Sequence, residues 1–149
     1  MEKIKPIGYV LAQTSKGFKN QLFSEFKSRN AELTFEQYVI LNLLNSNGNI
    51  IQQDLANHLQ KDKSIIVRQI DALIEKKYVV RLTNNEDKRK RNLILTDAGV
   101  EILDQSKKIS FEVSQRLLSG VNEKEIEIFR NVLNKIQENA GFEEEPFNC

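Results

Sequence analysis

The sequence predicts a mainly α-helical fold that carries one small β-hairpin. Apolar residues recur every three to four positions over most of the 149 residues, which is the period of an amphipathic helix. Two short β-rich segments, residues 78–82 and 92–95, interrupt this pattern and enclose a polar loop. Four of the five residues at positions 87–91 are basic, so the tip of the hairpin is strongly cationic. The length suits one domain with a real core.

The first expected helix runs from about Pro6 to about Arg29. Proline suits the first turn of a helix, because the amide hydrogen that it lacks has no helical partner there. An amphipathic stripe follows at three- to four-residue spacing: Ile7, Leu11, Thr14, Phe18 and Leu22.

A capping box at Thr34 and Gln37 opens the second helix. The Thr34 hydroxyl can accept from the Gln37 amide, and the Gln37 side chain can reach back. The helix carries Tyr38, Leu41 and Leu44. We expect it to end around residues 47–49, because the central glycine suits a left-handed residue after a helix.

Two shorter helices follow, and residues 61–64 are expected to form the turn between them. The apolar face of the third helix consists of Leu55, Ala56 and Leu59. The fourth helix places Ile66, Ile70 and Leu73 on one side. Ser64 and Arg68 then point away from that side, with Ile65 and Gln69 on its flank.

After the hairpin, Thr96 caps a long fifth helix. Its apolar positions are Ile102, Leu103, Ile109, Val113 and Leu117. Residues 119–120 interrupt the pattern, and a second capping box at Asn122 and Glu125 opens a last helix. Its apolar positions are Ile126, Phe129, Leu133 and Ile136. We expect residues 141–149 to form a flexible tail.

The net charge of +1 hides a strong asymmetry along the chain. Residues 61–91 hold ten Lys and Arg against five Asp and Glu, whereas residues 119–149 hold three against seven. A basic middle and an acidic end indicate that the middle part meets a polyanion.

Composition argues against several classes of protein. One histidine, His58, and one cysteine, Cys149, provide no Ser-His-Asp or Cys-His arrangement, and no glycine-rich phosphate loop occurs. We therefore expect no enzymatic activity and no cofactor. A zinc site needs several His or Cys ligands, so we also expect no metal. No apolar run approaches membrane-spanning length and no signal-peptide segment begins the chain, so we expect a cytoplasmic protein.

Two modest helices, a short turn and a hairpin make a winged helix-turn-helix. Several segments, in this order and spacing, resemble the MarR family of bacterial transcription regulators: Gln52-Gln53-Asp54-Leu55-Ala56, Asp62-Lys63-Ser64, residues 68–77, the Asp-x-Arg of residues 87–89, and Leu95-Thr96-Asp97-Ala98-Gly99. The resemblance covers nearly the whole chain. Two positions depart from the family. Lys77 stands where glycine is usual, and Ile51 stands where Thr or Ser usually caps the third helix, so Asn49 would have to cap it.

The resemblance implies a sequence-specific transcription regulator, a repressor or an activator, that binds double-stranded DNA as a homodimer on a palindromic operator. The dimerisation helices would span about residues 6–32 and 100–140, and the DNA-binding lobe about residues 33–99. The first, fifth and sixth helices also carry more apolar surface than a three-helix lobe can cover, which favours a two-fold dimer.

The expected DNA contacts lie at the start of the fourth helix and on the wing. Lys63 and Ser64, at a helix N-terminus, are placed for phosphates, while Ile65 either touches a thymine methyl group or packs on the preceding helix. The full expected set is Lys63, Ser64, Ile65, Arg68, Gln69, Lys88, Arg89, Lys90 and Arg91.

The resemblance assigns more specific roles to three of these charged residues. Arg89 corresponds to the family arginine that enters the minor groove. Arg68 lies on the outer face of the recognition helix, and its family counterpart is tied to the wing aspartate, here Asp87. Asp87 is therefore the expected support between wing and helix.

In the resembled family, small aromatic or phenolic anions bind between the dimerisation helices and the DNA-binding lobe. They favour dimers whose two recognition helices are wrongly spaced for DNA. The candidate lining residues, by helix face, are Tyr9, Gln13, Phe18, Tyr38 and Leu41; the alternative for each is a place in the core. The competing hypothesis for the whole chain is a winged-helix module that binds another protein and no DNA. A wing of that kind has no need for four cations.

Overall fold

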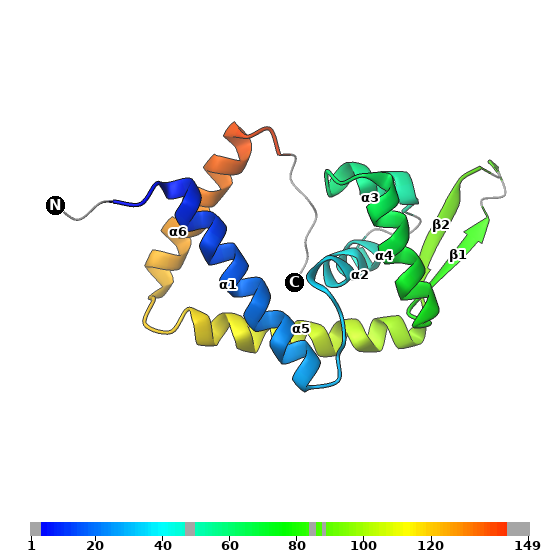
Figure 1. Cartoon of the computed structure of the whole chain (residues 1–149), viewed down its shortest axis with the longest axis horizontal. Coiled ribbons are helices and arrows are strands. Elements are labelled where there is room, and N and C mark those ends of the chain that lie inside the picture. Colours follow the sequence, from blue (N-terminus) through cyan, green and yellow to red (C-terminus); the bar gives the residue numbers. More distant parts are fainter. Residues whose placement is uncertain (1–3, 47–49, 84–85, 88, 143–149) are drawn as a thin grey trace.

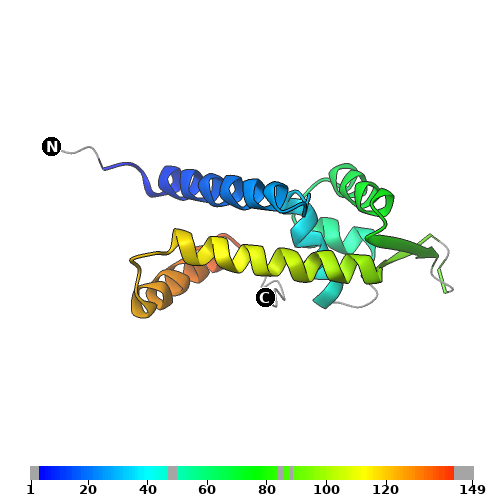
Figure 2. The same ribbon diagram turned by 90° about the horizontal axis from the view of Figure 1, so that it is seen from below.

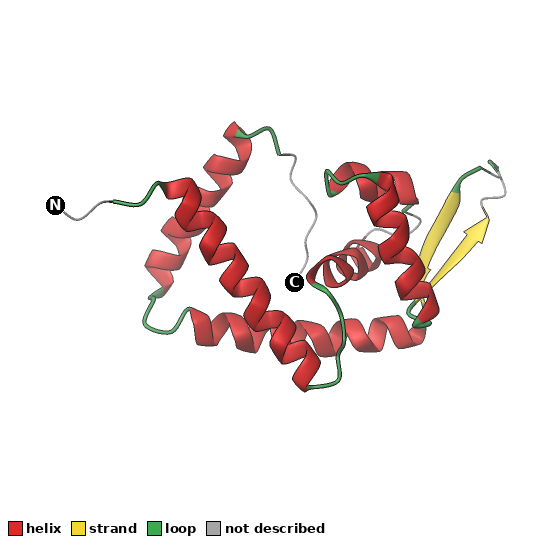
Figure 3. Ribbon diagram, in the orientation of Figure 1, coloured by secondary structure: helices red, strands yellow, loops and turns green. Residues whose placement is uncertain are grey.

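A computed structural model of the chain describes residues 4–46, 50–83, 86–87 and 89–142. Within these residues the expected helical fold with one antiparallel hairpin is confirmed (Figures 1 and 3). The elements are α1 (Ile7–Ser28), α2 (Phe35–Ser46), α3 (Gln52–His58), α4 (Lys63–Glu75), β1 (Val79–Thr83), β2 (Arg91–Leu95), α5 (Asp97–Leu117) and α6 (Glu123–Asn139).

Both expected capping boxes form. At the start of α2, the Gln37 amide donates to Thr34 Oγ1 and the Thr34 amide donates to Gln37 Oε1, each over 3.1 Å. At the start of α6, the Glu125 amide donates to Asn122 Oδ1 over 2.9 Å, and the Asn122 amide donates to Glu125 Oε2 over 3.0 Å. Each box satisfies amides that have no partner within the first turn of a helix.

The start of α4 differs from the expectation. The sequence places residues 61–64 in a turn, but α4 already begins at Lys63, with Asp62 before it in an extended conformation. Lys63 and Ser64 therefore belong to the first helical turn, because Asp62 supplies the carbonyl to which the Ile65 and Ile66 amides donate. The two side chains remain exposed at this end of the helix.

The start of α3 is stabilised without a side-chain cap from Ile51. The Asp54 carboxylate accepts from the Ile51 amide over 3.3 Å, which satisfies one amide at the helix start. The expected cap by Asn49 and the expected glycine ending of α2 fall on residues 47–49, which lie outside the described residues.

The core of the winged lobe lies between α2, α4 and the hairpin. The three apolar residues predicted for one side of α4, Ile66, Ile70 and Leu73, are fully buried. Strand β1 pairs with β2 in a register that runs from Val79 opposite Leu95 to Thr83 opposite Arg91. Val79 and Leu93 bring the inner face of this hairpin into the core.

The two longest helices, α1 and α5, pack together next to this lobe (Figure 2). Arg116 on α5 donates to Glu25 and Gln21 on α1, each over 3.1 Å. Arg29 also pairs with Glu25, and it reaches Glu112 on α5 over 2.6 Å. These pairs lower the pKa of Glu25, with the Arg116 hydrogen bond as the largest cause.

Helix α6 buries none of its residues in the single chain. Ile128, Phe129, Val132 and Ile136 are 40–54% exposed, and Ile126 and Leu133 are half-buried. Leu117, counted as an apolar position of α5, is also exposed. An amphipathic helix gains most of its stability from packing of its apolar face, so this face lacks its partner in one chain.

Candidate nucleic-acid interface

A cationic groove lies between the wing and the start of the two helices that precede it. The cavity measures about 370 Å³, and its lining joins the α3 start, the α4 start and the wing tip up to the first residue of β2: Ile51, Gln52, Gln53, Lys63, Arg89, Lys90 and Arg91. Four of these seven residues are cations, and none is acidic. Such a surface suits a phosphate backbone, because Lys and Arg neutralise phosphates and release their counterions.

Beside the groove, the N-terminal half of α4 presents polar and apolar side chains to solvent. Ser64 and Arg68 are exposed, and Ile65 is 39% exposed, as the helical period predicts. Gln69 is half-buried on the flank. A helix with a free face of this kind can read base edges in the major groove.

At the wing tip, Arg89 extends into solvent with a side chain that is 92% exposed. Its backbone amide donates to Asp87 Oδ1 over 3.0 Å, and its Nε does so over 3.3 Å. These two hydrogen bonds lower the pKa of Asp87 below its usual range. Asp87 thus shapes the wing tip around Arg89.

Asp87, the expected partner of Arg68, bonds locally to Arg89, which is two residues away and meets it within one turn. The expected tie between Asp87 and Arg68 stays a prediction. Lys88, also expected at the interface, lies outside the described residues.

A different arginine joins the wing to the helices. Arg81, on β1, donates through Nε to Gln52 Oε1 on α3 and through a terminal nitrogen to Asp71 Oδ1 on α4, each over 2.7 Å. Arg81 is not among the site residues expected from the sequence. The available signal was strand alternation, because Arg81 shares the inner face of β1 with buried Val79.

The five residues expected to line a ligand site lie in different surroundings, and their role stays a prediction. Tyr38 and Leu41 belong to the core, where the Tyr38 ring packs edge-on against Phe26 with a centroid distance of 5.5 Å. Tyr9 and Gln13 lie exposed on α1, and Phe18 is half-buried. The helical period predicts which residues share one face of a helix, but it does not predict which other element packs against that face.

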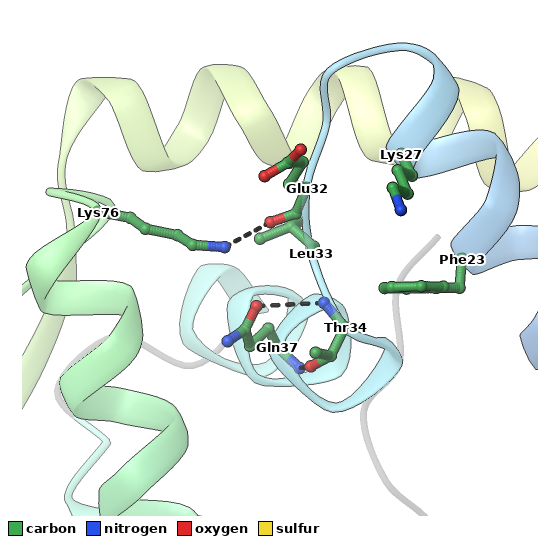
Figure 4. Close-up of a pocket in the computed structure, with 7 residues that line it drawn as sticks. All are labelled: Phe23, Lys27, Glu32, Leu33, Thr34, Gln37 and Lys76. Atoms are coloured by element: carbon green, nitrogen blue, oxygen red, sulfur yellow. Dashed lines mark hydrogen bonds between the residues drawn. The ribbon is translucent and has the colours of Figure 1, made fainter.

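A pocket of about 280 Å³ lies instead at the hinge between α1 and α2 (Figure 4). Seven residues line it: Phe23, Lys27, Glu32, Leu33, Thr34, Gln37 and Lys76. We call it the hinge pocket. Lys76, at the end of α4, donates to the Glu32 backbone carbonyl over 2.6 Å and so joins α4 to the hinge.

Two negative findings concern the described part of the chain. It contains no group of three or more His, Cys, Asp or Glu residues placed to hold a metal ion. None of its helices combines the length and apolar character that crossing a membrane requires.

Comparison with known proteins agrees with the geometry. The model of the MarR family matches residues 33–90. The HTH-type transcriptional regulator BilQ of Clostridioides difficile is 30% identical over 103 residues, which cover 69% of this chain and 68% of BilQ. YybA of Bacillus subtilis, an uncharacterised HTH-type transcriptional regulator, is 24% identical over 116 residues, which cover 78% and 77% of the two chains.

Two solved structures in complex with DNA share the fold. MepR of S. aureus superposes with a TM-score of 0.82 at 24% identity, covering 91% of this chain and 99% of MepR. A mutant of E. coli MarR in which serine replaces a cysteine, complexed with operator DNA, has a TM-score of 0.80 at 23% identity and covers 88% and 93%.

Proposed function

The chain belongs to the MarR family of transcriptional regulators, and on that basis we propose that it binds a palindromic operator in double-stranded DNA as a homodimer. The observation that carries the proposal is the cationic groove, in which Lys63 of α4 meets Arg89, Lys90 and Arg91 of the wing. Two elements from different parts of the fold thus present cations to one target. A wing that binds protein would not need this arrangement.

The proposal divides the contacts between two elements. Exposed residues at the start of α4 read bases, through Ser64, Ile65, Arg68 and Gln69. The wing cations and Lys63 hold phosphates, and Arg89 enters the minor groove, where a negative potential attracts arginine. Phosphate contacts fix the position of the protein, whereas base contacts supply the sequence preference.

The homodimer is supported by the surface of the single chain. The chain exposes 10847 Å², whereas a compact monomer of 17.2 kDa exposes about 7,800 Å². The excess includes the apolar residues on α1, α5 and α6, such as Ile7, Phe111 and Phe129. A two-fold dimer through these three helices covers them, at roughly 25 cal/mol per Å² of apolar surface buried. Sedimentation as a monomer at micromolar concentration would rule this out.

A salt titration of DNA binding tests the proposed function. In fluorescence anisotropy with a duplex of random sequence, log affinity should fall linearly with log salt, with a slope of about −0.9 per phosphate neutralised. Arg89→Ala should weaken binding and flatten the slope, because a protein that makes one phosphate contact fewer releases fewer counterions from the DNA when it binds. Arg130→Ala, which removes an exposed arginine from α6, serves as the matched control. A protein without affinity for duplex DNA would favour the alternative, a module that binds another protein.

The hinge pocket is the proposed site for an effector of small aromatic anion type. Phe23 and Leu33 supply apolar surface, and Lys27 and Lys76 supply cations. A ligand here would touch α1 and the end of α4 at once, so it could favour one spacing of the recognition helices over another. Benzoate is a suitable probe. Its effect on DNA affinity should disappear in Lys76→Met and persist in Lys108→Met, a control on the exposed face of α5.

A further inference from the structure

Arg81 occupies a junction of three elements. It sits at the centre of β1, opposite Leu93 of β2, and its side chain is 24% exposed. The guanidinium group donates to Gln52 at the start of α3 and to Asp71 in the middle of α4, each over 2.7 Å. One side chain therefore connects the wing, the helix that lines the cationic groove and the recognition helix.

The two strands of the wing are attached to the helices in different ways. Strand β2 is tied by its backbone, because the Leu93 amide donates to the Ile50 carbonyl over 3.1 Å and Asn92 forms a bridge with Ile51. Strand β1 pairs with β2 and follows α4 after a short turn, in which the Tyr78 amide donates to the Leu73 carbonyl over 3.0 Å. Beyond this turn, the Arg81 side chain adds hydrogen bonds to both α3 and α4. Arg81 is therefore placed to set the angle between the wing and α4.

We propose that Arg81 is a positioning residue for DNA binding, which holds the wing at the distance from α4 at which both elements engage one duplex. This inference rests on the proposed function. Gln52 is both a partner of Arg81 and part of the groove lining, so the contact fixes the groove wall next to Arg89 and Arg91. Two linked binding elements gain affinity only when their geometry allows simultaneous contact.

The chemistry requires arginine. A guanidinium group presents several N–H donors in one rigid plane and can bond two acceptors on different sides, as it does here with an amide oxygen and a carboxylate. An ammonium group on a flexible stem keeps the charge but not this geometry. Arg81→Lys should therefore behave like Arg81→Met in DNA binding, although it preserves the net charge.

A double-mutant cycle separates positioning from direct contact. Arg81→Met should lower affinity for a fixed duplex by about tenfold, because wing and helix no longer bind together. Adding Arg89→Ala to Arg81→Met should then change affinity far less than Arg89→Ala does alone. Arg81→Met and Lys63→Ala should combine additively, because Lys63 lies on α4 and keeps its phosphate when the wing moves.

Hydrogen exchange without DNA tests the same inference independently of the proposed function. In Arg81→Met, amide exchange should accelerate in β1, β2 and the start of α3, while α2 and α5 stay unchanged. Unfolding temperatures establish that each variant is folded. Additive effects of Arg81→Met and Arg89→Ala, or unchanged exchange in the wing, would overturn the positioning role. A wild-type protein that binds no duplex would overturn the proposed function, while the exchange result still decides the role of Arg81 in the fold.

Discussion

At the scale of single residues, the position of the wing depends on a close contact between two backbones. Thr96 donates through its amide to the Tyr78 carbonyl over 3.1 Å and through its hydroxyl to the Lys77 carbonyl over 2.6 Å. The same hydroxyl accepts from the Gly99 amide over 3.0 Å, so it caps α5 as the sequence predicts. These bonds bring the first turn of α5 directly against the residue that precedes β1.

Gly99→Ala tests how tight this contact is. A Cβ atom at position 99 would lie 2.1 Å from the Tyr78 carbonyl oxygen, so the two backbones must separate. We expect a loss of unfolding free energy of about 3 kcal/mol, at the high end for overpacking, because the obstacle is backbone and not a mobile side chain. Urea denaturation measures it. Gly17→Ala is the control, since its added methyl group meets nothing within 4 Å and should stabilise the helix. Equal effects of both changes would contradict this view.

At the scale of elements, the sequence predicts the features that depend on neighbouring residues, namely where helices start and which of their sides are buried. The three helix starts at Thr34, Thr96 and Asn122 follow from side chains that bond within three residues, and the structure confirms all of them. The buried side of α4 likewise follows from its period.

Contacts between distant residues could not be predicted in this way. Arg81 meets partners 10 and 29 residues away, and Lys76 meets a carbonyl 44 residues away. The hinge pocket combines α1, α2 and the end of α4, so no single helix face reveals it. Asp87 has a local partner in Arg89, which competes with any distant one.

The end of α4 allows a test at this scale. Lys77 has a φ of +64°, the left-handed conformation in which glycine is usual, so its departure from the family carries strain. Glycine relieves this strain, and the gain in free energy exceeds the cost of the larger conformational entropy that glycine gives the unfolded chain. Lys77→Gly should therefore stabilise the protein by about 0.5–1 kcal/mol. Glu75→Gly, two residues earlier within the helix, should destabilise it by about 1 kcal/mol. If the urea midpoints of both variants shifted in the same direction, the strain at Lys77 would be contradicted.

At the scale of the whole molecule, charged pairs hold α1 against α5, and acid should weaken them. The Arg116 hydrogen bond, with the nearby Arg29, lowers the pKa of Glu25. A group with a lowered folded-state pKa stabilises the protein above its unfolded pKa, and this contribution is lost as the pH falls through the folded value. The stabilisation by Glu25 is therefore lost at pH values below about 4.3, the ordinary pKa of glutamate.

Glu25→Gln tests this coupling between the helices. The variant should lower the unfolding temperature at pH 7, and its difference from the wild type should shrink as the pH falls below about 4. Glu101→Gln, which changes an exposed carboxylate on α5, controls for the general effect of acid. A difference between Glu25→Gln and the wild type that stays constant with pH would show that Glu25 does not link α1 to α5.

Selection of preferred sequences from a pool of random duplexes tests whether two recognition helices in a two-fold dimer read DNA. We expect an enriched inverted repeat whose half-site centres lie about 10 base pairs, or a multiple of that, apart. Gln69→Ala or Ile65→Ala should reduce the preference for that repeat over random DNA, whereas Lys90→Ala should weaken binding to both nearly equally. Enriched sequences without an inverted repeat, or recognition-helix and wing variants with the same selectivity, would contradict it.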